Sequence, residues 1–278
     1  MTKWYLKQFF FNALIFILFC PLGAWADLGK QSLASNVHKI YLGIEGGYSL
    51  STLANLSVNE GPNSASGFVW DPPGNGWDSR LGNTFEYGIV LGYNCTEALS
   101  LELAYNNRPS FYYEKAQILT SSSIGNRTRY FDLQNQTVML NGVVRLASIF
   151  NAVQNLKTRS RIEPFISLGA GVAKNTVSNF HSLGTDKRPG LIFSKMVDKT
   201  TYNFAAQAGL GLNFDLTTNW AMKAGYRFIY GGRFKTQDYI TDDPDGAHLN
   251  IPGSGNSANP WSGTLKINEF YLGLVYTL

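Results

Sequence analysis

The chain has 278 residues, a formal net charge of +4, 28 glycines and 15 tyrosines. This charge is too small to favour nucleic acid or a polybasic membrane anchor as a partner. Of the two cysteines only Cys95 lies beyond the predicted leader, so the exported chain would form no intrachain disulfide.

The first 26 residues have the pattern of a secretory signal peptide. Two lysines precede an apolar run over 9–19, which is too short to span a bilayer comfortably. Ala24 and Ala26 then supply the small-x-small pattern of a signal-peptidase site. We therefore predict a signal peptide over 1–26, cleavage directly after Ala26 and a periplasmic segment over 27–38.

After the leader, no stretch is apolar and long enough for a transmembrane helix. Segments in which apolar side chains alternate with small or polar ones recur instead, as in strands whose two faces meet different surroundings. We predict eight such strands, with approximate ranges 39–51, 84–95, 98–108, 130–146, 163–176, 201–215, 219–231 and 264–278.

The connections between these strands alternate between short and long. Short turns are expected near 96–97 and 216–218. Long connections, rich in Gly, Pro, Asn, Ser and Asp, are expected over about 52–83, 109–129, 177–200 and 232–263. Such segments are anomalous in a compact soluble domain, whereas an outer-membrane barrel has short periplasmic turns and long extracellular loops. Residues 147–162 depart from this rhythm, and either a short amphipathic helix at the periplasmic rim or longer flanking strands would explain them.

The alternation assigns one face of each strand to lipid and the other to the barrel interior. Aromatic residues near the strand ends are candidates for the interfacial girdles: Tyr48, Tyr93, Tyr105, Trp220, Tyr230 and Tyr276. The interior phase carries charged residues: Glu45, Glu86, Glu102, Arg145, Glu163, Lys223, Arg227 and Glu269. Eight strands leave an interior just wide enough for side chains to fill, and buried charges there must pair. We therefore predict an internal ion-pair cluster of Glu45, Glu86, Glu102 and Glu269 with Arg145, Lys223 and Arg227 that fills the lumen.

The last strand carries the alternation to the final residue of the chain. Its larger apolar side chains share one face: Phe270, Leu272, Leu274, Tyr276 and Leu278. A soluble protein rarely ends on such a strand, because an exposed apolar edge invites aggregation. In a closed membrane barrel the last strand pairs with the first and one face lies against lipid.

Taken together, these features resemble the eight-stranded outer-membrane barrel families: the transmembrane domain of OmpA, OmpX and the opacity-type proteins. The segments that carry the resemblance are 40–48, 164–172, 224–228 and 271–278. It implies an all-β, eight-stranded antiparallel transmembrane up-and-down barrel over 39–278, in the bacterial outer membrane. Its implied partners are outer-membrane lipid, lipopolysaccharide and the barrel assembly machinery. Those families usually end on Phe or Trp, and here Leu278 closes the C-terminal assembly signal formed by Phe270, Leu272, Leu274 and Tyr276.

An enzyme is not expected. The histidines are His38, before the first strand, and His181 and His248, in predicted loops. His181 and Ser182 are neighbours, but adjacent residues of a strand point to opposite faces, which suits a nucleophile–base contact poorly. We expect no cofactor and no metal site.

Two functions remain open at this stage. The first is a non-enzymatic surface protein that supports envelope integrity and presents its loops for adhesion, to host or phage surface ligands. Aromatic residues 111–113, in a predicted loop, fit either an adhesive patch or packing within the loop. The second function is a narrow pore or hydrophobic-solute conduit, as in OmpW-type barrels, and a conductance measurement would separate the two.

Overall fold

The computed structural model describes residues 37–58, 68–70, 81–119, 127–146, 162–186, 189–190, 192–237 and 260–278. The predicted signal peptide and its cleavage site lie outside these ranges. So does the ambiguous segment 147–162, apart from Ile162. Among the described residues, no helix combines the length and the apolar character needed to cross a bilayer.

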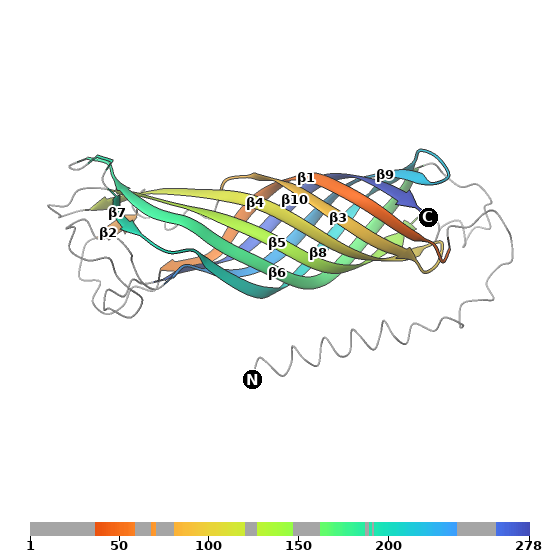
Figure 1. Cartoon of the computed structure of the whole chain (residues 1–278), viewed down its shortest axis with the longest axis horizontal. Helices are drawn as coiled ribbons and strands as arrows, with labels where there is room; N and C mark the ends of the chain where they lie inside the picture. Colours follow the sequence, from red (N-terminus) through yellow and green to blue (C-terminus); the bar gives the residue numbers. More distant parts are fainter. Residues whose placement is uncertain are drawn as a thin grey trace, which may run out of the picture. The chain divides into compact units, whose positions relative to one another are not determined.

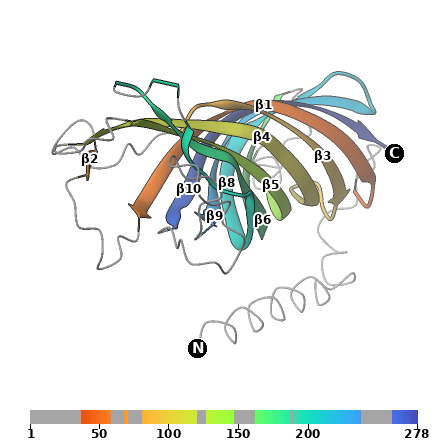
Figure 2. The same cartoon turned by 60° about the vertical axis from the view of Figure 1, so that its left-hand side comes forward.

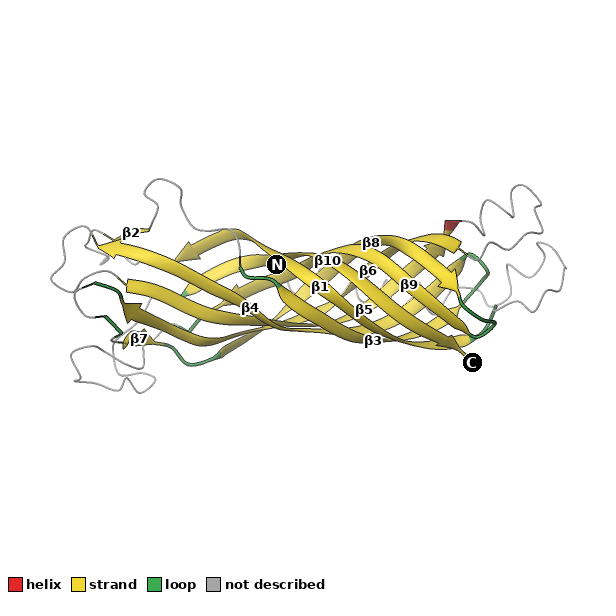
Figure 3. Cartoon of the chain, turned by 90° about the horizontal axis from the view of Figure 1, so that it is seen from above, coloured by secondary structure: helices red, strands yellow, loops and turns green. Residues whose placement is uncertain are grey.

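Eight long strands form a closed antiparallel ring (Figures 1 and 3). They are β1 Ile40–Val58, β3 Thr84–Asn94, β4 Leu99–Leu119, β5 Arg127–Arg145, β6 Ile162–Gly184, β8 Lys199–Asp215, β9 Trp220–Lys235 and β10 Trp261–Thr277. Each pairs with its neighbour along the chain, and β1 closes the ring by pairing with β10. Two short strands lie outside the ring, β2 Phe68–Trp70 beside β4 and β7 Ile192–Lys195 beside β6. The predicted eight-stranded antiparallel barrel is confirmed.

The two ends of the barrel differ in their connections. At one end, called here the short-turn end, residues 95–98 and 216–219 join neighbouring strands, and the chain ends at Leu278. At the other, called the long-loop end, lie β7 (Figure 1) and β2 (Figure 2). The short turns share one design, because the hydroxyl of Thr96 accepts hydrogen bonds from the amides of Ala98 and Leu99. In the β8–β9 turn the hydroxyl of Thr217 likewise accepts hydrogen bonds from the amides of Asn219 and Trp220. The sequence thus fixes these turns locally.

Several strands continue far beyond their predicted ends. A bilayer needs about 9–11 residues of a tilted strand, whereas β6 has 23 residues and β4 has 21. Stretches predicted as parts of long loops belong to ring strands in the structure: 52–58, 109–119, 127–129, 177–184, 199–200, 232–235 and 261–263. Irregular pairing within β4, between Arg108 and Phe111, shifts the alternation there. Asn179 and Gly232, with φ of 55° and 75°, lie close to similar irregularities in β6 and β9.

The chemistry of the two strand faces reverses along the barrel, as β5 shows. Toward the short turns its outward side chains include Leu140 and Val138, while Asn141 points inward. Toward the long loops its outward side chains are polar, and Leu133 and Phe131 are buried inside. Several predicted strands ended near this reversal, because the lipid-facing pattern disappears there, whereas the predicted strand 130–146 already included Leu133 and Phe131.

The same reversal around the ring defines three regions. The outward apolar residues form what we call the apolar belt. The outward polar residues between this belt and the long loops, such as Asp132 and Gln134 of β5, form what we call the polar collar. The belt contains Ile40, Leu42, Ile44, Tyr48, Phe85, Tyr87, Ile89, Leu91, Leu103, Tyr105, Val138, Leu140, Ile166, Leu168, Val172, Tyr202, Leu210, Leu212, Trp220, Met222, Phe228, Tyr230, Phe270, Leu272, Leu274 and Tyr276. Inside the collar lies a buried apolar cluster, the long-loop core: Leu53, Leu81, Phe111, Tyr113, Phe131, Leu133, Val177, Phe180, Met196, Ile229, Phe234, Trp261, Leu265 and Ile267.

Inward glycines make room for large rings at the level of the belt. A Cβ atom at Gly225 would lie 2.7 Å from Cζ of Tyr271, and one at Gly92 would overlap the ring of Tyr41. Tyr41 and Tyr271 are both buried. Each of these two rings therefore lies over a glycine of the neighbouring strand, where no side chain competes for space in the narrow lumen.

Candidate functional site

The barrel interior contains a central cluster of five charged residues, Glu45, Glu86, Arg108, Arg227 and Glu269, all buried. The strand register creates it, because Glu269 of β10 lies directly opposite Arg227 of β9. Arg227 contacts three carboxylates. Its Nε lies 2.5 Å from Glu269 Oε1, Nη1 lies 2.8 Å from Glu45 Oε2 and Nη2 lies 3.1 Å from Glu86 Oε1.

Arg108 reaches across the lumen from β4 to the same carboxylate. Its Nε and Nη2 lie 2.6 and 3.0 Å from the two oxygens of Glu269, and both side chains are 0% exposed. Nη1 donates to Asn135 Oδ1 at 3.0 Å, and the Ser49 hydroxyl donates to Glu269 Oε2. This bidentate contact fixes both groups and ties β4, β5, β1 and β10 together.

A second charged pair lies closer to the short-turn end. Lys223 Nζ contacts Glu102 Oε1, and the Tyr41 hydroxyl donates to the same oxygen at 2.7 Å. Lys223 also lies over the ring of Tyr41, 5.3 Å from its centroid. The buried charge is thus matched locally, and the pair is separate from the central cluster in its contacts.

Arg145 does not join the other predicted cluster residues. It lies at the short-turn rim, where Nη2 donates to Asn94 Oδ1 at 2.6 Å and Nη1 to the carbonyl of Glu97. Its nearest carboxylate contact, Glu163, is 3.9 Å away, and both side chains are partly exposed. The structure therefore divides the charged residues that the sequence groups together among three separate sites.

Arg108 is the central residue that sequence reasoning missed. The predicted strand ended at this position, although Arg108 follows Glu102, Ala104 and Asn106 on the inward phase. Following that phase for one more position would have revealed it. The long-loop core was also missed, because most of its residues lie in segments predicted as loops, although Phe131, Leu133, Ile229, Leu265 and Ile267 lie in predicted strands.

The residues proposed for the assembly signal lie on the outward face of β10. Phe270, Leu272, Leu274 and Tyr276 are exposed and belong to the apolar belt. Leu278 follows the end of β10, and its amide donates to the carbonyl of Ile40 at 3.0 Å. The final residue is therefore held at the seam between the last strand and the first.

The aromatic segment 111–113 is mostly internal. Phe111 and Tyr113 are buried in the long-loop core, and only Tyr112 is exposed on the outside. The ring of Tyr113 stacks on Phe131 with a centroid distance of 4.6 Å. These contacts correspond to packing within the barrel and leave a single aromatic ring for an external patch.

The described histidines make structural contacts. His181 belongs to β6, where its Nδ1 is 2.7 Å from the carbonyl of Asn179 and its ring stacks on Tyr130. Ser182 is buried on the opposite face. Over the described ranges no group of three His, Cys, Asp or Glu residues could hold a metal ion.

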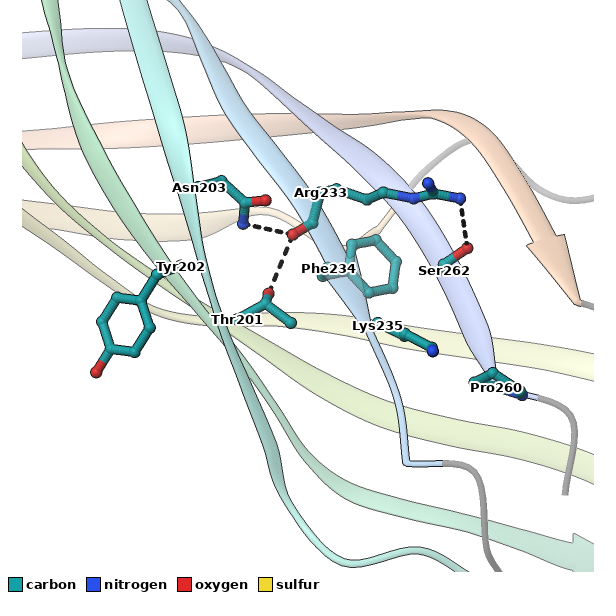
Figure 4. A pocket seen from close by; sticks show the side chains of 8 residues that line it. All are labelled: Thr201, Tyr202, Asn203, Arg233, Phe234, Lys235, Pro260 and Ser262. Carbon is teal, nitrogen blue, oxygen red and sulfur yellow. Dashed lines mark hydrogen bonds between the residues drawn. The ribbon is translucent and has the colours of Figure 1, made fainter. Parts of the chain in front are cut away.

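A surface hollow of about 580 Å³ lies where β8 and β9 separate (Figure 4). Their backbone pairing ends at Ala206 and Tyr230, although both strands continue toward the long-loop end. Above that point Thr201 and Asn203 of β8 donate to the Arg233 carbonyl at 3.0 and 2.5 Å. Side chains thus replace the missing backbone ladder at this seam.

Comparisons with known proteins agree with this architecture. A model of the family described as "Outer membrane protein beta-barrel domain" matches residues 13–277. The chain belongs to this family. Its members are proteins of the bacterial outer membrane, so the apolar belt faces lipid, the short-turn end faces the periplasm and the long-loop end faces outward.

Solved structures of outer-membrane barrels are similar to the chain at low sequence identity. OprG from Pseudomonas aeruginosa is 13% identical, with 88% of this chain and 99% of OprG covered and a TM-score of 0.46. Neisserial surface protein A is 12% identical, with 85% and 96% covered and a TM-score of 0.39. Ail from Yersinia pestis, in complex with a heparin analogue, is 13% identical, with 84% and 99% covered and a TM-score of 0.33. A comparison with curated protein sequences finds no match.

Proposed function

We propose that this outer-membrane barrel is a non-enzymatic, non-conducting scaffold that supports the envelope and presents its long loops for contacts at the cell surface. The observation that supports this proposal is the filling of the lumen at two successive levels. The central cluster occupies one level, with Arg108, Arg227 and Glu269 each less than 5% exposed. The long-loop core occupies the next, with Phe131, Leu133 and Trp261 at 1% or less.

The two levels would oppose passage of solutes by different means. An ion crossing the central cluster would have to displace guanidinium–carboxylate contacts of 2.5–3.1 Å. A water molecule crossing the long-loop core would find closely packed apolar side chains and few polar partners. Rigid strands that extend beyond the bilayer would hold the loops well above the lipid headgroups, where other surfaces can reach them.

A planar-bilayer recording tests the non-conducting part of this proposal. We expect no stable conductance steps from the folded barrel at either polarity. A matched pair of variants sharpens the test: Arg227→Ala opens the central cluster, whereas Arg145→Ala changes only the rim. Discrete channels in the unaltered protein would contradict the proposal and favour the alternative, a narrow pore or conduit.

A cell-binding assay tests the loop function. The connection 238–259 between β9 and β10 is replaced by a short Gly-Ser linker, and folding is checked by the mobility of the unheated barrel on denaturing gels. We expect bacteria that display the shortened variant to bind less to intact host cells or to a phage than bacteria with the complete chain. Equal binding, also after shortening 59–67 and 120–126, would contradict a role of the loops in surface contacts.

A further inference from the structure

We propose that the hollow at the β8–β9 seam is a binding site for a phosphate-bearing lipid headgroup of the outer leaflet. Its lining residues come from three strand ends: Thr201, Tyr202, Asn203, Arg233, Lys235 and Ser262. The proposal rests on the height of this hollow above the apolar belt, on its charge and on its shape, and it does not depend on the function proposed for the loops.

The height follows from the outward side chains of β9. Phe228 and Tyr230 belong to the apolar belt, and the next outward side chains are Arg233 and Lys235. At about 3.3 Å per residue, Arg233 lies within about 10 Å of Tyr230 along the strand. Tyrosine rings mark the membrane–water interface, so both cations lie at the level of the outer-leaflet headgroups.

The residues that line the hollow include two cations, Arg233 and Lys235, and no acidic residue. The strand ends over 199–202, 231–237 and 260–268 carry Lys199, Arg233, Lys235 and Lys266 and contain no acidic residue. On β10, Lys266 lies directly opposite Tyr230, next to the same seam. Among the residues that the structure describes, no carboxylate lies within ion-pairing distance of Arg233 or Lys235.

The shape of the site is fixed by contacts beneath the cations. The Arg233 carbonyl accepts hydrogen bonds from the side chains of Thr201 and Asn203. The guanidinium of Arg233 donates from Nη2 to Ser262 Oγ at 3.1 Å (Figure 4). Gly232, with a φ of 75°, allows the strand to bend at this position. Arg233 is therefore held at both its backbone and its guanidinium. The other N–H groups of the guanidinium can donate to phosphate oxygens.

The proposed ligand class follows from these three properties. A phosphate needs cationic donors, and a lipid places its phosphate at the edge of the hydrocarbon layer. Tyr202, 70% exposed at the end of the belt on β8, offers an apolar surface to the adjoining acyl chain. Phosphorylated lipid A is the chemical class that combines these features in the outer leaflet.

Native mass spectrometry of the folded barrel in detergent micelles tests the site with bisphosphorylated lipid A as the probe. The double variant Arg233→Gln with Lys235→Gln is compared with Lys39→Gln, which removes one charge at the short-turn end. Each basic residue near an anionic surface contributes about fivefold to affinity, so we expect the double variant to bind roughly 25-fold more weakly. The Lys39 variant should bind as the unaltered protein does.

Two further arms identify the source of the phosphate. Chemically dephosphorylated lipid A should bind the unaltered barrel no better than bisphosphorylated lipid A binds the double variant. Inorganic phosphate at millimolar concentration should not displace the lipid. Undiminished binding of lipid A by the folded double variant, or equal binding of the dephosphorylated lipid, would overturn the proposal, as would displacement by inorganic phosphate.

Discussion

The half of the barrel next to the short turns buries charged residues beside small apolar clusters, whereas the half next to the long loops buries one large apolar cluster. In the first, Leu272 and its neighbours face outward, while Glu269 and Arg227 are paired inside. In the second, polar residues face outward, and Leu133 and Phe131 are packed inside. The outer surroundings account for this difference, because lipid favours apolar surface whereas water forces the same strands to bury it.

The comparison also shows that a pair of neighbouring strands can pass from lipid to water while its backbone pairing continues. The β5–β6 ladder runs from Arg145 and Phe165 to Arg127 and Gly184 with one irregularity. Backbone hydrogen bonds therefore continue across the boundary, and only the side chains change. The central cluster lies next to this boundary, where Glu269 is followed on the inward face of β10 by Ile267 and Leu265.

The largest expected effect comes from opening the central cluster. Arg227→Ala leaves Glu45, Glu86 and Glu269 buried without their shared cation, which should cost about 3–5 kcal/mol of unfolding free energy. Urea unfolding in lipid vesicles, followed by tryptophan fluorescence, measures it. Arg145→Ala is the control and should cost less than about 1 kcal/mol, because its pair with Glu163 is long and partly exposed. Equal costs would remove the distinction between the cluster and the rim.

A somewhat smaller effect is expected in the long-loop core. Leu133→Ala creates a cavity among fully buried neighbours and should cost about 3 kcal/mol. Protease cleavage of the long-loop half should become faster, since the loss is local to that half. Leu140→Ala, on the lipid-facing side of the same strand, is the matched control. If both variants resisted protease equally, the long-loop core would not stabilise the protruding strands.

The reversal of the outward face predicts a difference between two identical charge insertions. Leu272→Arg places a cation in the middle of the apolar belt and should cost about 2 kcal/mol. Gln134→Arg places one in the polar collar, where we expect a change within about 0.5 kcal/mol. Refolding midpoints in vesicles compare the two variants. Similar costs would show that the belt and the collar meet the same surroundings.

The smallest expected effect lies at the short turns. Thr96→Ala removes the acceptor for two backbone amides of the β3–β4 turn and should cost about 1 kcal/mol. Thr218→Ala, in the other turn, removes only a contact with Asn219 and should be nearly neutral. Thermal unfolding of the two variants in micelles checks the difference, and an equal shift would argue against local control of the turns.

The strands of the lipid-facing half are the part of the fold that could be predicted from the sequence. There, the outward apolar side chains alternate with glycines and a few charges, so the eight strands and their inward phase are visible in the chain. In the protruding half the same test fails in several strands, as in β9, where Arg233 and Lys235 point outward and Phe234 inward. A pattern with polar side chains outward and apolar side chains inward does not distinguish a protruding strand from an irregular loop. Segments such as 232–235 are therefore predicted as loop from the sequence.

Within the candidate site, the sequence indicates which charged residues point inward, but it does not indicate which of them contact one another. Glu269 and Arg227 could be placed at similar depth by counting along neighbouring strands. Arg108 reaches Glu269 from the far wall, and no local pattern in β4 indicates that contact. Arg145 has the same phase as the others, yet its position at the rim depends on how far β5 and β6 extend.

The sequence by itself determined the strand pattern, the inward phase and the locally bonded turns, because each of these depends on residues that are close along the chain. Only the tertiary structure decided which charges meet, where lipid gives way to water and where β8 separates from β9. Those features depend on register and closure of the whole ring, which places side chains such as Arg108 and Glu269 together across 161 positions of sequence.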